Sequence, residues 1–241
     1  MPLSSAIALT AHLNACRHSA LSVEVAAHAV ISGHAAHHVI DEQSLLGLDP
    51  FGASELALAM AAALRLVDSD WFLVTPRPGR LAPLTGPPEL TARALDAGAV
   101  VVAATGGVAW VPQLVGPAVQ WSIEPANPPL PLSDPAEADR YLRESVLEAG
   151  RTLPDLPLGA NRRPDIEPPP ALPPVYGRRA QQTLARAWPL VHALDTALAD
   201  DLPPTHGVQE RRQTLSALRD AADTALVTAV SWTGALRREQ Q

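Results

Sequence analysis

The fold is decided by the stretch Asp70–Glu124, which reads DWFLVTPRPGRLAPLTGPPELTARALDAGAVVVAATGGVAWVPQLVGPAVQWSIE. Short apolar runs predict buried strands at 71–75 and 99–104. The turn Thr105–Gly107 is typical of a hairpin and leads into a further strand at 108–111. Residues 118–124 alternate, with Val119, Trp121 and Ile123 on one face, which predicts a strand with one face in water.

A helix is predicted at Glu89–Ala97, because Pro88 suits its first turn and Gly98 suits its end. This helix lies between two predicted strands. We therefore expect a strand–helix–strand crossover from Trp71 to Ala104, followed by a meander, in a mixed sheet.

Helices are predicted on both sides of this region. Their ranges are Ser4–Cys16, Ser22–Ile31, Phe51–Val67, a helix from a Ser133 or Asp134 cap to Gly150, Tyr176–Ala199 and Val208–Arg238. Either Ser54 or Asp49 could cap the third helix. The fourth should bury Tyr141, Leu142, Val146 and Leu147, and the last two should form an antiparallel hairpin.

These elements predict an α+β fold: a small mixed β-sheet covered by helices, with a C-terminal antiparallel helical hairpin. We expect an α+β domain at 1–152 and a Pro-rich linker or strap at 153–174. The hairpin should occupy 175–241 and pack on the first domain.

Two residue types restrict the chemistry. All 18 cationic side chains are Arg, so the chain has no amine for a Schiff base, a pyridoxal phosphate anchor or a phosphate-binding loop. Cys16 is the sole cysteine, which excludes an internal disulfide, a Cys-rich zinc site and an iron–sulfur cluster. We expect no cofactor.

The net charge of −7 argues against nucleic acid as a partner, because a phosphate backbone requires concentrated positive charge. No uncharged apolar run is long enough to span a bilayer, and no basic segment precedes the first apolar stretch. The sequence therefore predicts a cytoplasmic protein without membrane contact.

The loop Thr75–Pro88 is the first candidate site. Its prolines should make it stiff, and Arg77 and Arg80 could bind an anion near the N-terminus of the following helix, with the Thr85 hydroxyl as a third group. The alternative is a structural connection held by Leu81 and Leu84.

The second candidate is a metal site formed by His34, His37, His38 and Asp41. On a helix, His34 and His38 would share a face. On a strand, which Gly33 favours by ending the preceding helix, His37 and His38 would point to opposite faces. The alternative is a surface edge strand with polar ends.

Several short motifs resemble those of a family of uncharacterised actinobacterial proteins of about this length. They are Trp71–Gly79, Leu84–Pro87, Ala94–Val101, Val111-Pro112, Val119–Trp121 and the C-terminal Arg- and Ala-rich helix. Relatives typically carry an acid after the Pro-Gly pair, where this chain has Arg80. The resemblance implies the architecture and no assigned activity.

The leading functional hypothesis is a non-catalytic interaction or regulatory protein whose partner is another protein or a second copy in a homodimer. The alternative is a small anionic-ligand-binding protein or an enzyme that uses the Thr75–Pro88 loop. A further alternative is a metal-binding protein that uses the His34–Asp41 cluster.

Overall fold

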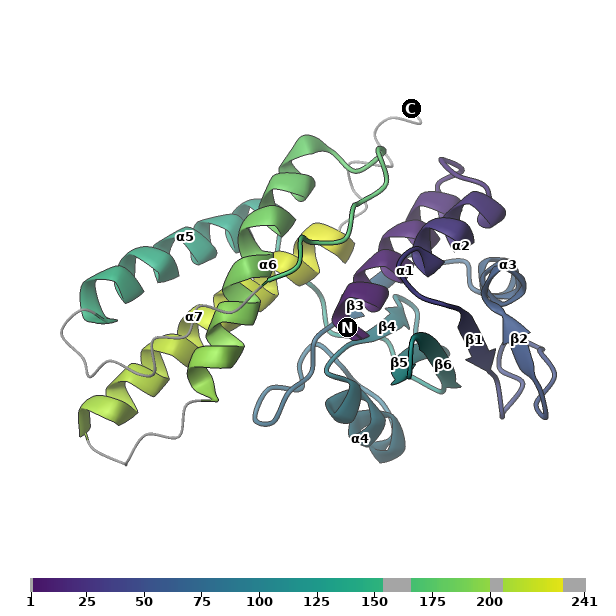
Figure 1. Cartoon of the computed structure of the whole chain (residues 1–241), viewed down its shortest axis with the longest axis horizontal. Coiled ribbons are helices and arrows are strands. Elements are labelled where there is room, and N and C mark those ends of the chain that lie inside the picture. Colours follow the sequence, from purple (N-terminus) through teal and green to yellow (C-terminus); the bar gives the residue numbers. More distant parts are fainter. Residues whose placement is uncertain (1, 154–165, 200–205, 232–241) are drawn as a thin grey trace. The chain divides into compact units, whose positions relative to one another are not determined.

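A computed structural model describes residues 2–153, 166–199 and 206–231. It confirms the α+β class (Figure 1). The chain divides into two compact units. The first contains residues up to Leu132, the segment Pro170–Gly177 and the end of the chain from Val230, and the second contains Ser133–Pro169 and Arg178–Ala229.

The first unit carries the sheet. Its elements are α1 (Pro2–Arg17), α2 (Val23–Ile31), β1 (His37–Ile40), β2 (Ala53–Glu55), α3 (Leu56–Leu66), β3 (Trp71–Val74), α4 (Pro88–Ala97), β4 (Val100–Ala103), β5 (Ala109–Val115) and β6 (Ala118–Glu124). The helices α5 (Pro135–Thr152), α6 (Arg178–Leu198) and α7 (His206–Ser231) follow.

The six strands form one mixed sheet in the order β2-β1-β6-β5-β4-β3. The strands β1 and β6 pair in parallel, whereas β3 and β4 are antiparallel neighbours. The expected crossover from Trp71 to Ala104 is therefore wrong. The loop that follows β3, together with α4, returns the chain to the end of the sheet at which β3 ended. Strand β4 therefore runs back along β3.

Each face of the sheet is covered by helix in the first unit, with α1 on one side and α4 on the other (Figure 1). Under α1 the rings of Trp71, Trp110 and Trp121 meet edge to face, with centroids 6.4 and 6.2 Å apart. All three tryptophans are fully buried. Aromatic pairs favour this arrangement, so the tryptophans define the core on this face.

The sheet face under α4 is less exposed to water than the alternation in 118–124 predicts. Leu90 and Ala94 of α4 pack with Val100 and Val102 of β4 in a buried cluster. The polar end of β6 is also covered, because Glu124 is buried and forms an ion pair with Arg93 of α4. Ser122 and Gln120 remain partly exposed.

The predicted helix Phe51–Val67 begins late, at Leu56. Residues 53–55 form β2 instead, where Glu55 pairs with His38 of β1. Glu55 is the N-cap, in place of Ser54 or Asp49. Backbone pairing with β1 is a tertiary contact, and it overrides the helical pattern at these positions.

In the second unit α6 and α7 pack together, as predicted. The guanidinium of Arg219 is buried and donates to both carboxylate oxygens of Asp195, at 2.7 and 3.1 Å, and it also pairs with Asp223. Asp139 of α5 accepts from Arg186 of α6 at 2.7 Å and from Arg143 at 2.9 Å. These bidentate and shared ion pairs join the three helices.

The predicted buried stripe of α5 is wrong in three of its four residues. Leu142 is buried, but Tyr141, Val146 and Leu147 are 45%, 42% and 62% exposed. The buried carboxylate of Asp139, held by Arg143 and Arg186, turns a different face of the helix inward.

Some predictions fall outside the described residues. They concern the first part of the Pro-rich segment, at 154–165, and the part of the last predicted helix that follows Ser231. The domain boundaries at 152 and 174 stay a prediction. No helix in the described ranges is both long enough and apolar enough to cross a membrane.

Candidate ligand-binding site

The helix α1 is unusual because polar side chains occupy its buried positions. Ser5, Thr10, His12 and Asn14 are all less than 7% exposed. Three of them have partners: the Thr10 hydroxyl donates to the Ala6 carbonyl at 2.8 Å, His12 bonds the Ala8 carbonyl, and Asn14 bonds the backbone of Trp71. The Ser5 hydroxyl is buried and has no hydrogen-bond partner among the described residues.

A pocket of about 480 Å³, the α1 pocket, lies along this helix. Ser4, Ser5, Ala8 and His12 form one wall. Their spacing places them on one face of a helix, so their side chains line the same side of α1. Sequence reasoning missed this set, although a helix with four polar side chains among its apolar residues was the available signal.

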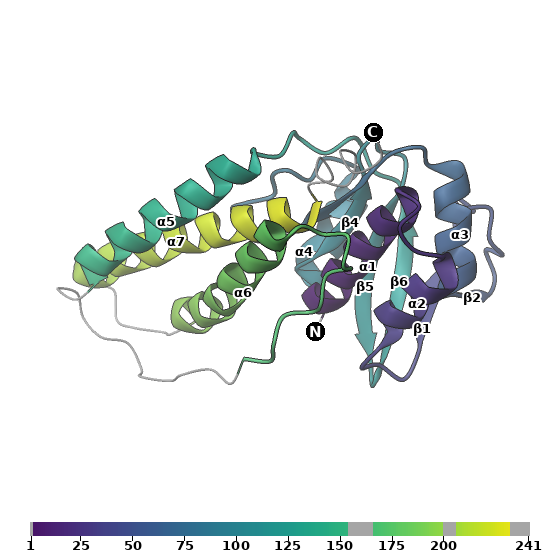
Figure 2. The same cartoon turned by 90° about the horizontal axis from the view of Figure 1, so that it is seen from above.

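The other walls come from distant parts of the sequence. Ala29 and Val30 at the end of α2, with Ser32 and His34 after it, form the second wall. The third is the strap, Pro170–Pro174, which runs beside α1 (Figure 2, green). Prolines fix the backbone of the strap and leave few N–H groups to satisfy.

Tyr176 anchors the strap. Its backbone N–H donates to the Pro173 carbonyl at 2.9 Å, and its buried hydroxyl donates to the Val230 carbonyl at 2.8 Å. Burial is the largest cause that raises the pKa of the Tyr176 hydroxyl, so it stays a neutral donor. The strap is therefore fixed to Val230, which belongs to the same unit.

The histidines around the α1 pocket are neutral near pH 7. Burial lowers the pKa of His12, and the bond to the Ala8 carbonyl opposes this only in part. Burial also lowers the pKa of His34. Neither Asp, Glu nor Arg appears in the pocket wall. The described wall contains a few polar groups but no charged side chain.

His37 lies next to His34, with ring centroids 5.0 Å apart. Nδ1 of His37 accepts a hydrogen bond from Nε1 of Trp121 at 3.2 Å. Because an indole nitrogen only donates, Nδ1 is unprotonated and the neutral ring carries its proton on Nε2. Burial first, then the neighbouring His34 and His38, lower the pKa of His37 to about 4.

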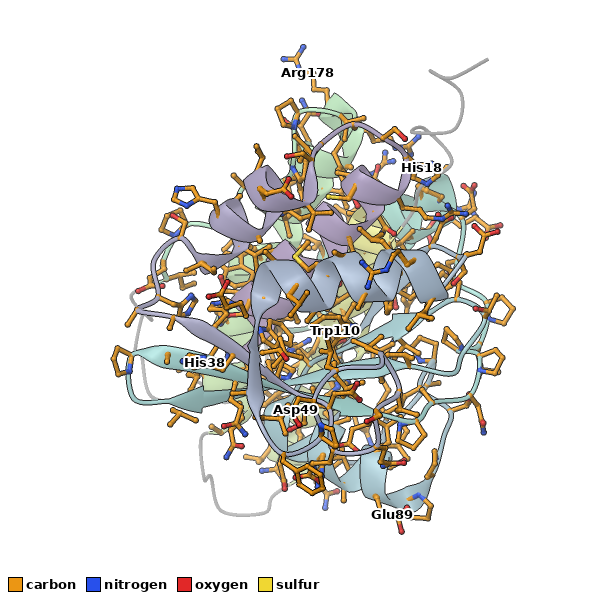
Figure 3. The ribbon with its side chains drawn as sticks, turned by 90° about the vertical axis from the view of Figure 1, so that its right-hand side faces the viewer. His18, His38, Asp49, Glu89, Trp110 and Arg178 are labelled. Atoms are coloured by element: carbon orange, nitrogen blue, oxygen red, sulfur yellow. The ribbon has the colours of Figure 1, made fainter. Side chains whose placement is uncertain are left out.

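The structure does not bring all four predicted metal ligands together. His37 is buried beside Trp121, and His38 is exposed on the opposite face of β1. In Figure 3 His38 lies away from Trp110 in the core. Asp41 is fully buried, and its carboxylate accepts from the backbone N–H groups of Leu45, Leu46 and Leu48. Within the described ranges, no group of three or more His, Cys, Asp or Glu side chains could hold a metal ion. A metal site here stays a prediction.

The predicted anion loop, Thr75–Pro88, is held in place by hydrogen bonds. Arg77 and Arg80 pair through their backbones, with N–H to carbonyl distances of 3.0 and 2.9 Å. The Thr85 hydroxyl donates to the Pro128 carbonyl at 2.6 Å. The α1 pocket includes none of these residues. An anion site at Arg77, Arg80 and Thr85 stays a prediction.

A second pocket, of about 340 Å³, lies on the other face of the sheet between α4 and β5. Arg93 and Asp96 of α4 line it, with Gln113 and Ser122 from the strands. Arg93 donates to Glu124 at 2.6 Å. Burial raises the pKa of Glu124, and the Arg93 guanidinium opposes that rise. The Arg93 guanidinium and the Glu124 carboxylate therefore compensate each other's charge.

The comparisons with known proteins concern mainly the first unit. No curated protein and no solved structure matches the chain. A family model described as "Rv1486c-like protein, N-terminal domain" matches residues 6–136. The match includes Ala8 and His12 of the α1 wall, the α2 wall and His34, but it includes neither Ser4 and Ser5 nor the strap. The chain therefore belongs to the Rv1486c-like family, which has no assigned activity.

Proposed function

We propose that this protein is a non-catalytic binding protein that holds a small molecule in the α1 pocket. The pocket volume of about 480 Å³ lies in the range of about 300–1,000 Å³ that ligand pockets occupy. Its wall combines apolar residues with a few polar groups, as such pockets do.

The buried Ser5 hydroxyl carries this proposal. Folded proteins pair nearly all of their buried polar groups, because an unpaired one costs about 1–3 kcal/mol. Ser5 is 1% exposed, has no partner among the described residues and lies in the pocket wall. A ligand that enters the pocket would supply the missing hydrogen bond.

The arrangement on α1 favours binding over catalysis. Ser5 and His12 are seven positions apart, which is about 10 Å along a helix axis. A histidine must lie within hydrogen-bond distance of a serine hydroxyl to activate it. His12 therefore cannot accept the Ser5 proton directly.

The proposal is tested by filling the pocket. Ala8→Leu places a larger side chain in the α1 wall, and Ala61→Leu makes the same change at a half-buried alanine of α3 outside the pocket. A fragment library is screened by ligand-observed NMR against the wild type and both variants. Fragments should bind the wild type and Ala61→Leu and should lose binding to Ala8→Leu. Equal binding to all three proteins contradicts the proposal.

A protein partner or a homodimer, the leading hypothesis from the sequence, is the second candidate. The exposed apolar side chains Tyr141 and Leu147 of α5 favour it, because aromatic and apolar groups are common in protein interfaces. Sedimentation over a range of concentrations tests self-association, and Tyr141→Ser with Leu147→Ser should weaken it. A monomer at every concentration excludes the homodimer. A cytoplasmic location is also part of this proposal, and cell fractionation tests it.

A further inference from the structure

The tautomer of His12 defines what the α1 pocket can recognise. Nδ1 of His12 lies 2.7 Å from the Ala8 carbonyl oxygen. A carbonyl oxygen only accepts, so Nδ1 must carry a proton. In a neutral ring the second nitrogen, Nε2, is then an acceptor with a free lone pair.

The position of the ring makes this acceptor available. His12 lines the pocket and is 6% exposed. Its Nδ1 edge is turned back along α1 toward Ala8, whereas Nε2 lies at the end of the ring farthest from the backbone. The structure gives Nε2 of His12 no hydrogen bond to another described residue.

The charge balance of the wall limits the ligand further. His12 and His34 are the titratable side chains in the described wall, and Ala8, Val30 and the strap prolines are among its apolar residues. A charged ligand would leave water without meeting an opposite charge, which is unfavourable. An uncharged ligand avoids this cost.

We propose that the α1 pocket selects an uncharged ligand that donates a hydrogen bond to Nε2 of His12. The Ser5 hydroxyl provides the second polar contact, and the apolar walls take the remainder of the molecule. Primary amides, ureas and neutral heterocycles with an N–H group have this chemistry. This inference rests on the proposed binding function and adds the chemical class of the ligand.

Three probes of nearly the same shape test the class. Benzamide is neutral, benzoate is an anion and benzamidinium is a cation. Each is titrated at up to millimolar concentration into the full chain, with chemical shifts of α1 and the strap as the readout. Benzamide should bind at least about tenfold more tightly than either ion, which corresponds to the loss of one charge-burial penalty.

Two substitutions at His12 test the acceptor. In His12→Gln the side-chain oxygen can stand near the position of Nε2, whereas in His12→Asn the amide can replace only the Nδ1 donor toward Ala8. Benzamide should keep its affinity within about twofold in His12→Gln and lose about fivefold or more in His12→Asn. Circular dichroism and melting of each variant establish that it is folded.

The outcomes distinguish a failure of the proposed binding function from a failure of the proposed ligand class. If none of the probes shifts the α1 and strap resonances, the proposed binding function fails. If benzoate or benzamidinium binds as well as benzamide, or if His12→Asn binds benzamide like the wild type, the pocket binds ligands but the proposed class is wrong.

Discussion

The carboxamide of Asn14 binds both backbone groups of Trp71. Oδ1 accepts from the Trp71 N–H at 2.8 Å, and Nδ2 donates to the Trp71 carbonyl at 2.9 Å. These groups lie on the outer edge of β3, the last strand of the sheet. Asn14 therefore takes the place of a further strand, and the Ser231 hydroxyl does the same for the N–H of Leu73.

We predict that Asn14→Ala destabilises the protein by about 3 kcal/mol, because it leaves two buried backbone groups without partners. Urea unfolding measures the change. Gln113→Ala, at an exposed position of β5, is the control and should change stability by less than about 0.5 kcal/mol. A loss below about 1 kcal/mol for Asn14→Ala would show that the edge is held by other contacts.

Acid should destabilise the first unit through His37. Its pKa is about 4 in the folded protein, below the value of about 6.5 in an unfolded chain. Between these values the unfolded chain binds more protons, so stability is complete above about pH 6.5 and falls as the pH decreases toward 4. Unfolding in urea at several pH values measures this slope.

The matched variant for this effect is His37→Asn, whose side-chain oxygen can stand near the position of Nδ1 and accept from Trp121. It should show a smaller loss of stability between pH 6.5 and 4 than the wild type. The lowered pKa values of His12 and His34 act in the same direction and remain in the variant. An unchanged slope would mean that His37 does not titrate as a buried neutral ring.

The hairpin turn offers a direct comparison of two glycines. Gly106 and Gly107 have φ of +75° and +86°. A Cβ on Gly106 would lie 2.6 Å from the backbone nitrogen of Pro128, whereas one on Gly107 would meet no atom within 4 Å. Gly107→Ala should cost about 1–2 kcal/mol from backbone strain, and Gly106→Ala should cost more because the 126–128 segment must move. Equal melting temperatures would contradict the predicted clash.

The inward face of α5 can be checked with two leucines. Leu142 is 3% exposed and Leu147 is 62% exposed. Leu142→Ala should destabilise by about 2–5 kcal/mol, because it leaves a cavity. Leu147→Ala should stay within about 0.5 kcal/mol of the wild type. A larger effect at Leu147 would show that the helix is turned as the sequence pattern predicts.

Local patterns predicted most of the elements. Apolar runs and turn residues place β3, β4 and the hairpin into β5, and the Ser22 and Asp134 caps mark the starts of α2 and α5. The predictions that were wrong have a common cause. The start of α3, the antiparallel pairing of β3 with β4 and the buried face of α5 all depend on partners that are far apart in the sequence or on a shared ion pair.

By itself the sequence determined the α+β class, because helical and strand periodicities are local properties of the chain. It also determined that this chain carries no Lys amine and a single thiol, on Cys16, because these are facts of composition. The α1 pocket was decided by tertiary structure. Its three walls lie near residues 5, 30 and 172, and no pattern within one segment reveals that packing brings them together around His12.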